Sequence, residues 1–267
     1  MLDGHVHTPY CPHGSKAPFE KYIEEAIKAD YESLTFAEHA PLPENFTDPV
    51  PAKDSAMDRQ LVESYIKEIE ALKKSYSSQI EIKLGFEVDF IKGYEKETEN
   101  FLNEYGSRLD DSILSVHFLP LGKQWFCIDY SPEVFSDACK AAGSIDQLYR
   151  LYYSLLTDSV RADLGRYKPQ RIGHMTLIRK FHYLFPSPDK WNQYAKSFLN
   201  TVYEEKLQLD YNGAGLVKEH CRESYPPENL ALEAYEKGIS LIYGSDAHHP
   251  NGIKQGYDKL KQSIMKG

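Results

Sequence analysis

The chain has 267 residues and a formal net charge of −9, from 31 basic and 40 acidic side chains. Hydrophobic residues make up 41% of it, enough for a sizeable core, yet no run approaches the roughly 20 apolar residues that cross a membrane. Because Lys and Arg do not cluster, we expect neither a nucleic-acid partner nor a membrane partner. The sequence leaves the oligomeric state open.

Short β-rich segments alternate with longer segments of helical periodicity. In chain order the predicted strands are Leu2–Thr8, Ser33–His39, Ile80–Phe90, Ser112–Phe118, Arg171–Met175, Gln208–Asn212 and Ser240–His248. Apolar residues with helical spacing run from Phe19 to Ile27, Leu61 to Leu72 and Ile145 to Leu156, and the last two helices are predicted at Pro227–Lys237 and Gly252–Lys266. About seven such units predict a parallel barrel or a doubly wound sheet.

Three connections between these elements are long: Ala40–Ala56, Leu119–Gly143 and Lys180–Lys190. Loops that follow strand ends often carry function on parallel α/β scaffolds. The chain contains no linker, internal repeat or low-complexity tract, so we predict that residues 1–267 form a single domain.

The four cysteines are not arranged in Cys-x-x-Cys pairs, which argues against a zinc ribbon or a disulfide scaffold and suits a reducing compartment. No basic segment followed by an apolar run begins the chain, so we expect no signal peptide and a cytoplasmic protein. The cysteines are Cys11, Cys127, Cys139 and Cys221.

Two pairs of metal-type ligands occur near the two ends of the chain. His5 and His7 flank Val6 in the first predicted strand, and Asp246 and His248 flank Ala247 at the end of the last. Side chains two apart in a strand point to the same face, so each pair faces one way. A closed barrel would bring the two pairs together.

Further ligand-type side chains lie at or near the ends of other predicted strands. A carboxylate buried in an apolar strand is costly without a partner. In a parallel barrel the carboxyl ends of all strands share one rim, where imidazole and carboxylate groups could hold two or three Zn, Mn or Fe ions. Each residue alone also fits an ordinary structural role, but their convergence favours a metal site. These side chains are His39, Glu87, His117 and His174.

The order of these motifs resembles the polymerase and histidinol phosphatase (PHP) family. The resemblance runs from His5 to His248, and Glu38-His39-Ala40-Pro41 and Gly85-Phe86-Glu87-Val88-Asp89 point to its histidinol-phosphatase branch. It implies an irregular seven-stranded (β/α)7 TIM-like barrel. It also implies three metal sites: His5, His7, Glu87 and Asp246; Glu87 as a bridge to His117 and His174; and His13, His39 and His248.

The resemblance further implies hydrolysis of L-histidinol phosphate to L-histidinol and phosphate in histidine biosynthesis. We expect a metal-bridging hydroxide to attack phosphorus, with Glu87, Asp246 and His248 as catalytic residues. Candidate phosphate ligands are Arg161 and Arg179, because guanidinium matches phosphate bidentately, and candidate contacts to the histidinol moiety are Glu223 and Trp125.

Three other functions are compatible with this pattern. The main alternative is a PHP-type phosphoesterase that acts on another small phosphate, such as a nucleotide or a sugar phosphate. A metal-dependent amidohydrolase also uses a barrel and an N-terminal His-x-His, but typically places a Lys where Glu87 stands here. A non-catalytic metal-binding protein is the third, and it is disfavoured because every expected ligand is present.

Overall fold

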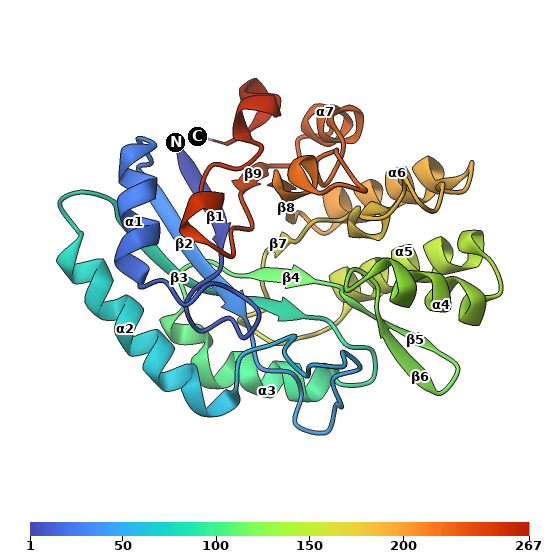
Figure 1. Ribbon diagram of the computed structural model, residues 1–267, viewed down its shortest axis with the longest axis horizontal. Helices are drawn as coiled ribbons and strands as arrows, with labels where there is room; N and C mark the ends of the chain where they lie inside the picture. Colours follow the sequence, from blue (N-terminus) through green and yellow to red (C-terminus); the bar gives the residue numbers. More distant parts are fainter. Residues whose placement is uncertain (267) are drawn as a thin grey trace.

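Seven parallel strands form the centre of the computed structural model, which describes residues 1–266. Their order is β1-β2-β3-β4-β7-β8-β9, and helices surround them (Figure 1). The ring closes where the His7 amide donates to the Ala247 carbonyl (3.0 Å) and the Asp246 amide donates to the His5 carbonyl (2.7 Å). The predicted seven-stranded α/β barrel is therefore confirmed. The strands are β1 Leu2–Val6, β2 Ser33–His39, β3 Glu81–Asp89, β4 Ile113–Ser115, β7 Arg171–Ile172, β8 Gln208–Asn212 and β9 Leu241–Gly244.

Several strands are shorter than their patterns predict, which makes the barrel irregular. All seven residues of β2 are buried, as expected for a parallel strand covered on both faces. By contrast β4 has three residues and β7 has two. The histidines and carboxylates at the ends of β4, β7 and β9 consequently lie in the loops just beyond the strands.

Seven α-helices pack around the barrel in residues 1–266. The helices predicted near residues 19–27, 61–72, 145–156 and 227–237 are present, whereas α3, α4 and α6 were not predicted. None of the helices in residues 1–266 is long and apolar enough to cross a membrane. The helices are α1 Phe19–Lys28, α2 Val62–Ser75, α3 Glu95–Tyr105, α4 Pro132–Ala142, α5 Ile145–Arg161, α6 Trp191–Glu204 and α7 Glu228–Glu236.

The helix predicted over Gly252–Lys266 is wrong. This segment contains short 3-10 turns, including Tyr257–Lys259 and Gln262–Ile264. Gly256, directly before the first of these turns, has a φ of 76°, in the left-handed region that a right-handed α-helix cannot contain. The apolar spacing instead places Ile264 against the core.

The connection Leu119–Gly143 is largely ordered into regular elements. A two-stranded antiparallel hairpin, β5 Phe118–Leu121 and β6 Gln124–Cys127, lies beside the barrel and is followed by α4. Ser131 caps that helix, since its hydroxyl accepts from the Val134 amide (3.3 Å).

An arginine fills the barrel interior at the amino ends of the strands. Arg171, the first residue of β7, is buried and donates to the Gly4 carbonyl and to Asp111 Oδ2, both at 2.7 Å. A side chain at Gly4 would collide with this guanidinium, so the close approach of the two strands requires glycine there. This charged floor closes one end of the barrel and leaves the other rim for the site.

Candidate metal centre

The carboxyl rim of the barrel encloses a cavity of about 370 Å³. The predicted ligands converge on it from the ends of six different strands and from the loop after β1. His5 and His7 lie fully buried at its base. Seven of the nine predicted ligands line the cavity: His13, His39, Glu87, His117, His174, Asp246 and His248.

Glu87, in the carboxyl half of β3, stands at the centre of the cluster and is 1% exposed. Its Oε2 atom lies 3.4 Å from His5 Nε2 and 3.5 Å from His7 Nε2. Its Oε1 atom lies 2.8 Å from His174 Nε2 and 3.7 Å from His117 Nε2. One carboxylate therefore faces two separate sets of imidazoles, the arrangement of a bridging ligand.

The ionisation of Glu87 follows from these neighbours. Burial alone raises the pKa of its carboxyl group, but His5, His117 and His39 outweigh burial and hold the pKa well below its usual range. The carboxylate is therefore charged at neutral pH and is available as a ligand.

Three of the histidines are oriented by buried carboxylates. In each pair the acid accepts from Nδ1, which leaves Nε2 directed at the cluster and fixes the ring orientation, as is usual for metal-binding histidines. The pairs are His5 with Asp210 (2.8 Å), His7 with Glu38 (3.1 Å) and His117 with Asp89 (2.8 Å). No such role was predicted for Asp210 or Glu38.

Buried nitrogen atoms and the spacing of the ligand atoms indicate that the cluster can hold divalent ions. The atoms His5 Nε2, His7 Nε2 and His39 Nδ1 are buried and make no well-formed hydrogen bond in the described part of the chain, although carboxylate oxygens of Glu87 and Asp246 lie 3.1 to 3.4 Å away. Buried polar atoms are nearly always paired, so these nitrogens indicate a missing partner. Ligand atoms lie within 4.8 Å of one another in two sets that share Glu87: one with His5 and His7, the other with His117 and His174. Such nitrogen and oxygen donors suit Zn, Mn or Fe.

A further set surrounds His248. Its ring stacks on His7 with centroids 3.9 Å apart, and the His13 ring lies 5.0 Å away on another side. His13 is held by its Nδ1 atom, 2.7 Å from the Asp54 carbonyl. Cys11 also offers a ligand atom near His39 and His248, but burial, together with Glu38, raises the pKa of its thiol well above the usual value. Cys11 is therefore a protonated thiol while the site holds no metal.

Asp246 lies just beyond β9 with a φ of 54°, a left-handed conformation that is uncommon for residues other than glycine. This turn directs its Oδ1 atom to 3.2 Å from His7 Nε2 and 3.6 Å from His248 Nδ1. Burial raises the pKa of Asp246, but His5 and His7 outweigh it and hold the pKa well below its usual range. Asp246 is therefore an ionised carboxylate between two of the ligand sets.

The predicted phosphate ligands do not line the cavity. Arg161 is the last residue of α5, which leads into the next parallel strand and therefore ends at the opposite rim. The Arg161 guanidinium lies there, 3.9 Å from the Glu204 carboxylate. Arg179 is on the correct side but is buried, and its guanidinium is occupied by Glu223 at 2.5 and 3.1 Å. The structure therefore places neither guanidinium at the cavity, and the Glu223 carboxylate is paired with Arg179.

Trp125, a predicted contact to the histidinol moiety, does not line the cavity either. Its ring lies edge-on to Phe46, with centroids 5.1 Å apart, in a small apolar cluster that anchors the Ala40–Ala56 connection. The Lys side chains that line the cavity are Lys180 and Lys218, neither of which the sequence analysis singled out.

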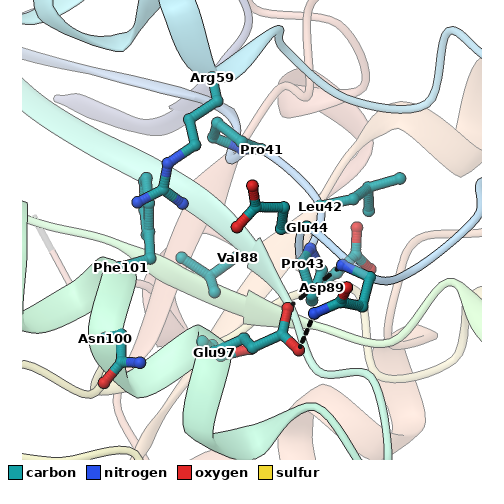
Figure 2. Close-up of a pocket in the computed structure, with 12 residues that line it drawn as sticks. Pro41, Leu42, Pro43, Glu44, Arg59, Val88, Asp89, Glu97, Asn100 and Phe101 are labelled. Carbon is teal, nitrogen blue, oxygen red and sulfur yellow. Dashed lines mark hydrogen bonds between the residues drawn. The ribbon is translucent and has the colours of Figure 1, made fainter.

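A second cleft of about 210 Å³ lies between the loop after β2 and helix α3, and Asp89 borders both cavities (Figure 2). Two of its charged groups are already paired. Glu97 accepts from the Asn45 side chain (3.1 Å), and Arg59 Nη2 lies 2.8 Å from Glu104 Oε2. The imidazole-lined cavity is therefore the better candidate site.

A parallel barrel with a carboxylate between sets of imidazoles at its carboxyl rim is typical of metal-dependent hydrolases. The PHP domain matches residues 3–214 of the chain. The chain is also 46% identical over 258 residues to the histidinol-phosphatase of Bacillus subtilis (strain 168), with 96% of each chain covered. The chain belongs to the PHP family.

Two crystal structures share this fold. A candidate histidinol phosphatase of Listeria monocytogenes is 36% identical, with a TM-score of 0.93 over 97% of this chain and 99% of that one. Histidinol phosphate phosphatase of Lactococcus lactis, solved with zinc, L-histidinol and phosphate, is 18% identical, with a TM-score of 0.71 over 99% of this chain and 94% of that one. The second likeness is one of fold.

Proposed function

We propose that this protein is a metal-dependent histidinol-phosphatase, which hydrolyses L-histidinol phosphate to L-histidinol and inorganic phosphate in histidine biosynthesis. The observation that carries the proposal is Glu87, ionised and shared by two sets of imidazoles that include unpartnered buried nitrogens. The close likeness to the Bacillus subtilis histidinol-phosphatase supports the choice of substrate.

The nine ligands would hold up to three divalent ions of Zn, Mn or Fe. When bound, such ions stabilise the charge on phosphoryl oxygens and lower the pKa of bound water. Glu87 would serve two sites at once, since each of its oxygens faces a different set. We assign the sites as His5, His7, Glu87 and Asp246; Glu87, His117 and His174; and His13, His39 and His248.

The protonation states of Asp246 and His248 limit the chemical role that each can take. Asp246 is ionised, so it is suited to bind a divalent ion and holds no proton to donate to the leaving alkoxide. Burial and the neighbouring His7 lower the pKa of His248 to about 3, so His248 is neutral near pH 7 and suited to bind a metal. We assign both Asp246 and His248 as metal ligands.

The test is the release of inorganic phosphate from L-histidinol phosphate by metal-loaded and chelator-treated protein, beside a panel of sugar phosphates and nucleotides. We expect fast turnover of histidinol phosphate, abolished by chelation. Faster turnover of another small phosphate would favour the alternative phosphoesterase, and turnover that survives chelation would refute the metal-dependent mechanism.

We also propose that the chain forms one domain, because a single apolar core extends from β1 to the last turn around Ile264. The four cysteines are free, in keeping with a protein of the cytoplasm. The absence of nucleic-acid and membrane partners stays a prediction from charge.

A further inference from the structure

Lys180 projects into the cavity from the loop after β7 and is held there by Asp129. Its Nζ atom donates to Asp129 Oδ2 (3.0 Å) and to the Asp129 carbonyl (2.7 Å). Asp129 comes from a different element, the connection between β6 and α4, and its Oδ1 atom also accepts from the Cys127 thiol (3.3 Å). The two side chains are 22% and 20% exposed, so both are largely withdrawn from solvent while lining the cavity.

The ammonium group of Lys180 has donor capacity left. An ammonium carries three N–H bonds, and Asp129 accepts two of them. Burial lowers the pKa of Lys180, but Asp129 outweighs burial, and Asp246 across the cavity raises the pKa further. Lys180 therefore stays protonated at neutral pH, with one N–H free for a ligand.

Its neighbour Arg179 cannot bind phosphate but can fix the position of Lys180. The Arg179 guanidinium stacks on Trp191, with Cζ 3.8 Å from the ring centroid, and donates to Ser187 Oγ (2.6 Å). Its other donors reach Glu223. The backbone on the N-terminal side of Lys180 is thereby attached to α6 and to the loop after β8.

We propose that the free N–H of Lys180 binds a non-bridging phosphoryl oxygen of the substrate, with Asp129 as its positioning residue. The inference rests on the proposed phosphatase function. A lysine held at two points loses little conformational freedom on binding, unlike Lys218, an exposed side chain at the end of a 3-10 turn. Lys180 stays protonated throughout and transfers no proton.

The test measures inorganic phosphate binding to the metal-loaded protein by calorimetry, with KM and kcat for histidinol phosphate measured in parallel. Lys180→Met removes the charge at similar length, and Lys180→Arg restores it. Lys73→Met is the matched control, because Lys73 forms a Lys–Asp pair of similar exposure with Asp110 (2.6 Å) at the opposite rim. Lys218→Met tests the other lysine of the cavity.

We expect Lys180→Met to weaken phosphate binding about 10- to 100-fold, the usual effect of losing a hydrogen bond to a charged group. Lys180→Arg should recover most of the loss, Lys73→Met should change binding less than 2-fold, and metal content should be unchanged. Because Lys180→Met leaves Asp129 unpaired, the double variant Lys180→Met/Asp129→Asn provides the measurement if the single variant does not fold.

Binding within 2-fold of wild type in a folded, metal-replete Lys180 variant would overturn the proposal. An equal or larger loss in Lys218→Met would overturn it as well. Since inorganic phosphate is the probe, weakened binding without turnover of histidinol phosphate would uphold the role of Lys180 and refute only the choice of substrate.

Discussion

Asp210 is predicted to set the metal affinity of the first site without touching a metal. It is fully buried in the barrel interior on β8, and its Oδ2 atom accepts from His5 Nδ1 (2.8 Å) and from the Asn212 side chain (3.0 Å). Asp210→Asn keeps the size of the side chain but removes the charge that makes His5 a stronger ligand. Substitutions of such supporting groups typically cost 10- to 100-fold in metal affinity, or about 1.4 to 2.7 kcal/mol.

The assay is a titration of metal-free protein with Zn²⁺ or Mn²⁺ against a competing chelator. Asp3→Asn is the matched control. Asp3 is equally buried and accepts from the His5 and Ser245 amides through Oδ1 (3.2 and 2.9 Å), but it makes no hydrogen bond to the His5 ring. An amide oxygen can replace Oδ1, so we expect unchanged affinity in that variant.

Two results would refute this reasoning about Asp210. Wild-type affinity in Asp210→Asn would show that the hydrogen bond to His5 does not tune the ligand. An equal loss in Asp3→Asn would show that the loss of any buried carboxyl group on this side of the barrel disturbs the site. Thermal melts of both metal-free variants separate these outcomes from a general loss of folding.

Four further outcomes are expected. Chelation should lower Tm, because metal at 1,000 times its Kd adds about 4 kcal/mol of stability; calorimetry across a metal titration measures this, and a Tm independent of metal would contradict it. Gly4→Ala should lower the free energy of unfolding, measured by urea denaturation, by about 3 kcal/mol, because its methyl group would overlap the Arg171 guanidinium. Arg161→Ala should leave kcat/KM within 2-fold of wild type, since that side chain is exposed at the far rim. A larger loss would show that Arg161 takes part in the reaction after all. Burial raises the pKa of Asp129, but Lys180 outweighs it and the folded pKa is lowered, so this carboxylate contributes stability above about pH 4 that is lost as pH falls further. The destabilisation caused by Asp129→Asn should accordingly shrink below pH 4 in denaturant titrations, and a constant difference would contradict the pairing.

Local sequence patterns were sufficient for the β/α units and for most of the candidate metal ligands, whereas the choice of a barrel over a doubly wound sheet came from the family resemblance. The alternation of a strand places His5 and His7 on one face whatever surrounds them, and a parallel barrel gathers its strand ends on one rim. Helical spacing of apolar residues likewise predicted α1, α2, α5 and α7. His13 was the exception, because no periodicity marks a loop residue and only the family resemblance suggested it.

Only the tertiary structure decided which charges support the site. Asp210 lies in the middle of an ordinary strand, and its role depends on a contact with a residue 205 positions away. Arg179 and Lys180 are adjacent in sequence but point to different places. Arg179 packs on Trp191 and pairs with Glu223, whereas Lys180 pairs with Asp129 and lines the cavity. Sequence periodicity reports which face of an element is buried; the partner that meets that face is set by the packing of distant segments, which no local pattern contains.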